Sequence, residues 1–204
     1  MTMYNPEPFR VEDKEAALTF ISSHDFAIIA SHGELCVTHT PMTIIHRDDP
    51  ITLFGHFSRK NPHCNLLDGK TRQTCIFAGP HTYVSPSWYE TNPAVPTWNY
   101  SAVHVTGTAS AITEETDLKK HLLSLTARHD PQLNAEDYMP VKFMRGMMKG
   151  IVGFTLSVEK IEFKHKLSQN RPNEDRRAVA ATLSRSDNTE ARAVADAMQQ
   201  FFDD

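Results

Sequence analysis

The sequence predicts a mainly β protein with peripheral helices, built as a small closed or partly closed barrel of antiparallel strands. Six or more short strand-like runs lie in the middle of the chain without a helix between each pair, which excludes a regular βαβ array. Amphipathic helical patterns lie at the margins. Barrel closure is favoured because it removes exposed strand edges. The 204 residues are enough for one domain with a small appendage.

The N-terminal half begins with a helix and continues as hairpins. Residues 11–23 carry apolar residues at helical spacing behind two acids. A connection containing Gly33 predicts a first hairpin, and Asp48-Asp49-Pro50 supplies the turn of a second. Strands are therefore expected at residues 26–30, 35–40, 43–45, 51–54, 74–78 and 83–85.

The C-terminal half adds two long strands and several helices. Residues 101–112 and 151–166 alternate apolar and polar residues, as strands do. Helices are expected at residues 113–128, with Thr113 as N-cap, at residues 138–149, and through the tail from Pro172. The aromatic, proline-rich loop at residues 86–98 is expected to be packed, as a lid or a subunit contact.

The end of the strand at residues 51–57 carries the clearest binding signal. Ser58, Arg59 and Lys60 follow one another directly, and these side chains hold phosphate by charge-assisted hydrogen bonds. The positive charge is local, because the whole chain has a formal charge of -4. Alternatively Ser58 caps a helix that begins at Arg59, but cations in a first helical turn oppose the macrodipole. The anion-binding interpretation is favoured.

A second polar segment, residues 166–172, follows the last predicted strand. Its Lys, Ser, Gln, Asn and Arg side chains offer donors and acceptors suited to a heteroaromatic ring or a phosphate. The alternative is a polar loop that leads into a helix capped by Asn173. The residues alone leave both interpretations open.

Composition excludes several classes of protein. Hydrophobic residues make up 40% and charged residues 23%, as in globular proteins. No apolar run is long enough to span a bilayer, and residues 1–10 lack the pattern of a signal peptide, so we expect a cytoplasmic protein without a membrane contact. The three cysteines form no disulfide or zinc pattern, and no histidine spacing indicates a metal site.

Five segments together resemble the PaiB family of FMN-binding negative transcriptional regulators. They are residues 56–62, 79–89, 95–100, 150–154 and 166–172, and the similarity runs from about Met3 to the end of the chain. The resemblance implies an FMN-binding split barrel of antiparallel strands, related to pyridoxamine 5'-phosphate oxidase, that forms a homodimer with FMN between the subunits. It also implies a barrel domain at residues 1–170 and a helical extension at residues 171–204, packed on the barrel or the dimer.

The same resemblance assigns roles to particular residues. Arg59 and Lys60 would hold the FMN phosphate with help from Ser58, and the strand containing Thr38 and His39 would lie along the isoalloxazine. The remaining expected cofactor contacts are His56, Trp98, Asn99, Gln169, Asn170 and Arg171. The oxidase pattern has an Arg-Gln pair where this chain has Ser101 and Ala102, so the reaction of that enzyme is not expected.

Two functions from different classes follow. The first is a flavin-binding regulator of transcription. Because the tail from Arg171 carries five arginines against seven acids, any DNA contact is expected from the dimer and not from this tail. The second is an FMN-dependent oxidoreductase that acts on a small molecule, with histidines such as His56 and His104 near the substrate. The ordinary alternative for each histidine is a polar core position.

Overall fold

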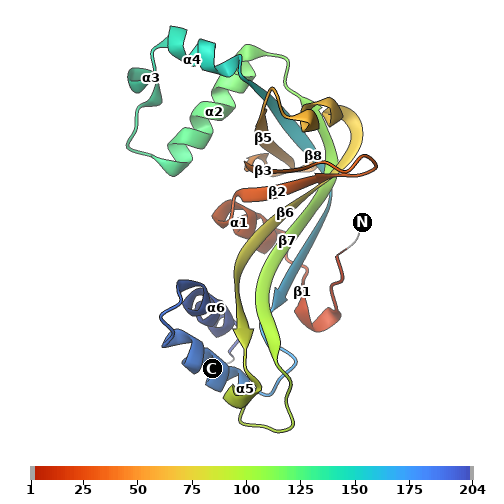
Figure 1. The fold of residues 1–204 in the computed structure, drawn as a ribbon, viewed down its shortest axis with the longest axis vertical. Coiled ribbons are helices and arrows are strands. Elements are labelled where there is room, and N and C mark those ends of the chain that lie inside the picture. The colour runs from red at the N-terminus through yellow and green to blue at the C-terminus, as the bar shows by residue number, and fades with distance from the viewer. Residues whose placement is uncertain (1–2, 203–204) are drawn as a thin grey trace. The chain divides into compact units, whose positions relative to one another are not determined.

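The computed structural model describes residues 3–202, and for residues 135 and 136 the backbone alone. The chain forms two compact units. The described part of unit 1 comprises residues 3–20, 78–104 and 162–202, and unit 2 comprises residues 21–77 and 105–161. Three long strands contribute residues to both units, namely β6 (Asp68–Val84), β7 (Thr97–Ala111) and β8 (Ile151–Lys166) (Figure 1).

The strands form one antiparallel sheet in the order β3-β2-β6-β7-β8-β5-β4, with β1 beside β8. The shorter strands are β1 (Arg10–Val11), β2 (Phe26–Ser31), β3 (Val37–Pro41), β4 (Thr43–His46) and β5 (Thr52–Ser58). β2 pairs with β6 and β5 pairs with β8. The fold is therefore mainly β, as predicted.

In unit 2 the two ends of this sheet meet. β3 and β4 are the outermost strands, yet only Met42 separates them in the chain. The hydroxyl of Thr40 on β3 donates to the carbonyl oxygen of His56 on β5 at 2.7 Å. The sheet is thus curled into a partly closed barrel, and this confirms the predicted split-barrel fold.

Aromatic side chains fill the inside of unit 2. Phe54, Phe77 and Phe154 are fully buried, and the rings of Phe57 and Phe154 lie 4.6 Å apart. Gly55 is needed for this packing, because a Cβ there would lie 2.4 Å from Met42 Sδ. Because side chains alternate along β5, Phe57 shares one face with Gly55, whereas His56 shares the other face with Phe54, whose ring centroid lies 6.3 Å from its own.

Helices α2 (Glu115–His129), α3 (Ala135–Tyr138) and α4 (Val141–Met148) also belong to unit 2. The side chains of Leu118, Met144 and Met148 pack against Phe54. Glycine at position 153 leaves room for Leu118, because a Cβ on residue 153 would lie 2.5 Å from Leu118 Cδ1. α2 begins later than predicted, after Glu114, because the backbone of Ile112 is still bonded to Gly153. The helix predicted at residues 138–149 is interrupted at Pro140, since the residue before a proline disfavours helical angles.

Unit 1 contains α1 (Lys14–Ser23) up to Phe20, and the tail helices α5 (Asn173–Ser184) and α6 (Thr189–Gln199). The tail helices pack together around Val179, Leu183 and Val194 (Figure 1). Short 3-10 helices occur at η1 (Glu7–Phe9), η2 (Pro62–Leu66) and η3 (Pro86–Trp88). None of the helices in the described part of the chain is long and apolar enough to cross a membrane.

The main difference from the sequence prediction is the length of β6. Residues 74–78 and 83–85 were expected as separate strands, but β6 runs without interruption through Gly79 and Pro80. Glycine is needed at position 79, because a Cβ there would lie 2.6 Å from the ring of Phe20 and 3.3 Å from the carbonyl oxygen of Ser101. Glycine thus marks a close approach inside a strand and not a strand end.

Candidate functional site

The segment that carries the strongest sequence signal forms a tight turn at the end of β5. The backbone N–H of Asn61 donates to the carbonyl oxygen of Ser58 at 2.8 Å. No helix begins at Arg59. The next helical segment, η2, begins at Pro62, and Asn61 caps it by accepting from the backbone N–H of His63 at 3.0 Å. The alternative in which Ser58 caps a helix at Arg59 is therefore wrong.

Arg59 is exposed but its guanidinium is held in place. Its Nε donates to the carbonyl oxygen of Lys149 at 2.7 Å, and its Nη2 donates to that of Ile151 at 2.8 Å. The backbone N–H of Arg59 also donates to Gly150. A guanidinium has five N–H groups, so three remain for an anion. Preorganisation of this kind reduces the entropy lost when a ligand binds.

Ser58 and Lys60 complete the turn, and both are exposed. Within the described part of the chain, the Ser58 hydroxyl accepts only a long contact of 3.4 Å from the backbone N–H of Lys60. Among residues 3–202, no side chain or carbonyl group forms an ion pair or hydrogen bond with the Lys60 ammonium. The Ser58–Asn61 turn thus presents a hydroxyl and two cations that retain donors for an anion.

A chain of hydrogen bonds connects this turn to β3 and β6. Asn61 Nδ2 donates to Thr38 Oγ1 at 3.0 Å, and Thr38 Oγ1 lies 3.0 Å from His63 Nδ1. On the other side of the ring, His63 Nε2 lies 3.0 Å from Gln73 Oε1. Gln73 Nε2 donates to the carbonyl oxygen of Leu66 at 3.2 Å.

These partners fix the direction of every bond in the chain. Because the Gln73 amide nitrogen faces a carbonyl oxygen, its Oε1 must accept, so His63 carries its proton on Nε2. His63 Nδ1 must then accept from the Thr38 hydroxyl. Burial lowers the pKa of His63, which the bond to Gln73 opposes only in part, so the ring is held neutral. The ring also stacks on Phe57 with centroids 4.8 Å apart.

The network separates the two predicted residues of β3. The Thr38 side chain points toward the Ser58–Asn61 turn, to which Asn61 joins it. His39 lies on the opposite side of the strand, is exposed, and stacks on Phe26 with centroids 6.2 Å apart. The structure therefore brings Thr38, and not His39, together with the turn.

His56 contains a buried polar atom without a partner. Its Nδ1 has no hydrogen bond within the described part of the chain, although a buried nitrogen of this kind normally has one. Burial lowers the pKa of His56, so the ring is neutral at pH 7. An unpaired buried nitrogen two residues before Ser58 is a position where a ligand atom could bind.

In unit 1, Trp98 and Asn99 have opposite environments. Trp98 is exposed, and its ring lies 6.0 Å from that of His81 and 6.4 Å from that of Tyr83. Asn99 is fully buried and its amide exchanges hydrogen bonds with Ser168 at 3.0 and 3.2 Å. Trp98 is thus available to a planar ligand, whereas Asn99 holds β7 against the exit of β8.

The polar segment after β8 is folded largely on itself. Gln169 accepts from the backbone N–H of Leu167 and donates to the carbonyl oxygen of His165, both at 2.7 Å. Arg171 lies over the ring of Tyr89 at 4.6 Å. Asn170 is exposed. A cofactor contact from this segment therefore stays a prediction, and for Gln169 it would replace existing bonds.

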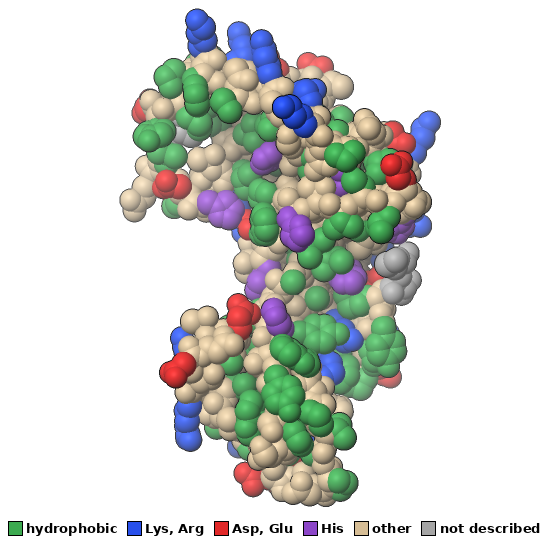
Figure 2. All heavy atoms as spheres, viewed as in Figure 1, with side chains coloured by type: hydrophobic (Ala, Val, Ile, Leu, Met, Phe, Trp, Pro, Cys, Tyr) green, Lys and Arg blue, Asp and Glu red, His purple; other side chains and the backbone are tan. Residues whose placement is uncertain are grey.

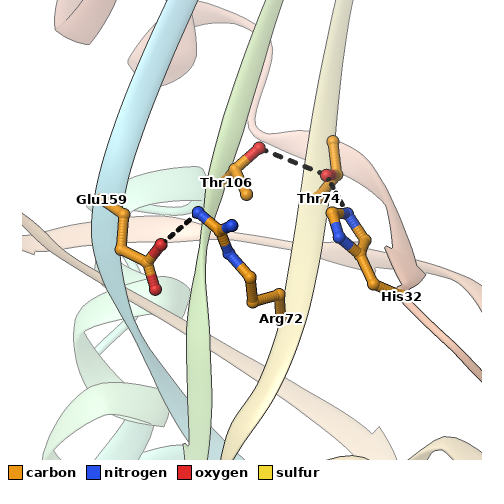
Figure 3. A network of polar contacts seen from close by, with 5 residues as sticks. All are labelled: His32, Arg72, Thr74, Thr106 and Glu159. Atoms are coloured by element: carbon orange, nitrogen blue, oxygen red, sulfur yellow. Dashed lines mark hydrogen bonds and ion pairs between the residues drawn. The ribbon is translucent and has the colours of Figure 1, made fainter. Parts of the chain in front are cut away.

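A second polar network in unit 2 joins His32, directly after β2, to residues of β6, β7 and β8 (Figure 3). His32 Nε2 lies 2.8 Å from Thr74 Oγ1, which lies 3.3 Å from Thr106 Oγ1. Beside it, Arg72 forms an ion pair with Glu159. Burial lowers the pKa of His32. Because each group already has a partner across the strands, we assign this network to pairing of the sheet.

Cysteine and metal chemistry have little support. The three cysteines are free, and burial raises the pKa of the Cys75 thiol to about 12, which keeps it protonated. Burial also raises the pKa of Cys64. Within the residues that the structure describes, no group of three His, Cys, Asp or Glu side chains is placed to hold a metal ion.

The sequence interpretation missed His63, Asn61 and Gln73. Their only local signal is the run Asn61-Pro62-His63 directly after the cationic pair. Gln73 lies ten residues beyond His63 and meets it through folding of the chain. A helix cap followed by a buried histidine could have indicated a structured turn, but not the partners of that histidine.

Comparisons with known proteins identify the family of the chain. Residues 3–160 match a family model described as "Putative FMN-binding domain". The chain is 33% identical over 202 residues to the Protease synthase and sporulation protein PAI 2 of Bacillus subtilis, with 97% of each chain covered.

Among solved structures, one similar fold is an FAD and heme binding protein from Mycobacterium smegmatis, with a TM-score of 0.60 and 14% identity over 83% of this chain and 79% of that one. Another is the flavocytochrome Anf3 from Azotobacter vinelandii, with a TM-score of 0.57 and 14% identity over 78% and 69% of the two chains. These likenesses support the fold alone.

Proposed function

Because the chain belongs to the "Putative FMN-binding domain" family and to the PaiB family, which the Bacillus protein PAI 2 represents, we propose that it binds FMN and acts as a negative regulator of transcription. The observation that carries the cofactor assignment is the Ser58–Asn61 turn, with its prearranged guanidinium and unpaired ammonium. We further propose a cytoplasmic homodimer with FMN between the subunits. The division into residues 1–170 and 171–204 stays a prediction.

The residues present suit FMN better than FAD. FMN ends in a phosphate monoester that carries close to two negative charges at neutral pH, and Arg59 and Lys60 together supply two positive charges. The FAD diphosphate is internal and has no such terminal group. Ser58 would add a hydroxyl donor to the phosphate, and the unpaired Nδ1 of His56 would form a hydrogen bond with the cofactor or a bound water. When bound, FMN supplies hydride or single-electron transfer.

The cofactor assignment is tested by flavin release and by affinity measurements. Purified protein should be yellow and should release FMN on denaturation. Arg59→Ala and Lys60→Ala should each weaken FMN binding by about 10- to 100-fold, the loss expected for one charge-assisted hydrogen bond, and should change riboflavin binding little. Lys70→Ala, in the same basic segment, is the matched control. An equal loss for FMN and riboflavin would refute the phosphate assignment, and tighter binding of FAD than FMN would refute the choice of cofactor.

The regulator assignment rests on the family. The tail from Arg171 has more acids than arginines, so it is not the expected DNA contact. Figure 2 shows Lys and Arg side chains gathered over the helical part of unit 2, which offers one basic surface. Mobility shift at physiological salt, with oxidised and reduced flavoprotein, is the direct measurement. Absence of binding to every promoter fragment in both redox states would contradict direct regulation.

An FMN-dependent oxidoreductase is the second candidate, and His56 is the observation that favours it. A neutral imidazole with an unpaired nitrogen can exchange a proton with a substrate during flavin chemistry. Steady-state oxidation of NAD(P)H with a small quinone as acceptor tests this function. His56→Gln should lower the turnover measured per bound flavin. Turnover no faster than that of free FMN would remove this candidate.

A further inference from the structure

A cavity of about 280 Å³ lies beside the start of β8, between α2 and α4, entirely within unit 2. Its apolar wall includes Leu118 and Met148, which are at most 8% exposed, and Ile151. Apolar surface of this kind favours a hydrocarbon body over water. The wall is supported by the hydrophobic core around Phe54, where Gly153 allows α2 to approach β8 closely.

The polar wall has an excess of positive charge. Arg59, Arg145 and Lys149 face Glu114 and Glu115. Arg145 Nε is already paired with Glu115 at 2.8 Å, which leaves two cations against one carboxylate. Among the residues that the structure describes, no group forms an ion pair or hydrogen bond with the Lys149 ammonium. The Arg59 guanidinium is anchored to the carbonyl groups of Lys149 and Ile151 at the edge of this cavity.

We propose that this cavity, the α2–α4 pocket, binds a small organic anion with an apolar body. The anionic group lies against the Lys149 ammonium and the apolar body lies against Leu118 and Met148, whereas the free N–H groups of Arg59 are left to the flavin phosphate. The uncompensated charge favours an anion over a cation, and the apolar wall favours a hydrophobic acid over inorganic phosphate. Arg59 also belongs to the Ser58–Asn61 turn, so the pocket adjoins the proposed flavin site. Its occupancy is nevertheless a separate question from flavin binding.

The test is calorimetric titration of the full-length flavoprotein with three molecules of similar shape. They are 3-phenylpropionate, its neutral analogue 3-phenylpropanol and the cation 3-phenylpropylamine. The anion should bind at least about tenfold more tightly than the alcohol, the factor expected for one charge-assisted hydrogen bond, and the amine should bind most weakly. Equal affinities for all three, or no binding of the anion at millimolar concentration, would overturn the proposal.

Two lysines of the same helical segment provide a matched pair of variants. Lys149→Met should weaken binding of 3-phenylpropionate about tenfold, whereas Lys142→Met, on exposed α4 but outside the cavity wall, should leave it unchanged. Both lysines are exposed, so both variants should keep the parent melting temperature. An equal effect of both variants would mean that general surface charge, and not the pocket, attracts the anion.

FMN affinity separates this inference from the proposed function. Lys149→Met should keep the parent affinity for FMN, and saturating FMN should not displace 3-phenylpropionate. Displacement by FMN would show that the cavity belongs to the flavin site and would overturn the inference. Binding of 3-phenylpropionate by a protein that binds no flavin would refute the proposed function and leave the inference standing.

Discussion

The hydrogen bond from Thr38 to His63 provides the sharpest test of the geometry around the turn. Thr38→Val keeps the shape of the side chain but removes the hydroxyl. Among the described residues it therefore removes the only donor to His63 Nδ1, a buried atom in a residue that is 0% exposed. Asn61 loses an acceptor as well, but its amide is half-buried and can turn to water.

The expected cost follows from which atom stays buried. An unsatisfied buried acceptor costs about 1–3 kcal/mol of unfolding free energy. Reversal of the His63 tautomer does not avoid this cost, because the Gln73 amide would have to flip and would lose its bond to Leu66. Thr38→Ser keeps the donor and removes a half-buried methyl group, so it should cost less than about 1 kcal/mol.

Urea unfolding of the parent and the two variants at pH 8 measures the difference. Thr38→Val should be less stable than Thr38→Ser, and the double variant with His63→Phe should show a coupling energy of at least about 0.5 kcal/mol. If valine and serine cost the same, or if the two sites are additive, the direction assigned to the network is incorrect.

The same histidine predicts a dependence of stability on pH. Burial places the pKa of His63 in the folded protein below its value of about 6.5 in the unfolded chain. Below that pH the unfolded state therefore binds more protons than the folded state. The contribution of His63 to the free energy of unfolding is fully present above pH 6.5 and decreases as the pH falls toward the folded pKa. His63→Phe should reduce the difference between unfolding free energies at pH 8 and pH 5.5. An unchanged difference would mean that His63 does not titrate on unfolding.

Two further predictions concern packing and the aromatic loop. Gly107→Ala would place a Cβ 2.0 Å from the carbonyl oxygen of Ser157 and should lower the free energy of unfolding by about 1–3 kcal/mol or more. Gly146→Ala has open space around its Cβ in α4 and should raise the free energy of unfolding by about 0.5–1 kcal/mol. Equal melting temperatures for the two variants would contradict this packing. Asp175 is fully buried and accepts hydrogen bonds from the backbone N–H and the hydroxyl of Thr91 at 2.9 and 2.6 Å. Asp175→Ala should therefore increase the rate of proteolysis within residues 89–96. An unchanged cleavage rate would show that other contacts hold the loop.

Much of the fold was determined by local patterns. The hairpins at β2–β3 and β4–β5, the long strand β8 and the tail helices follow from side-chain periodicity and turn residues, which act over a few positions. The same locality made Arg59 and Lys60 recognisable as a candidate anion-binding pair. The sequence did not reveal that β6 is continuous, because glycine and proline inside a strand give the same local pattern as the end of a strand.

The sequence by itself determined that a strand ends in a hydroxyl and two cations, and that the chain resembles flavin-binding proteins. Only the tertiary structure decided that Arg59 is anchored to carbonyl groups about ninety residues away and that Thr38 faces His63. It also decided that the Asn99 amide is hydrogen-bonded to Ser168. The physical reason is that residue types reveal which bonds a side chain can make, whereas the partner depends on strand register and closure of the barrel. Both bring together atoms that are distant in the sequence.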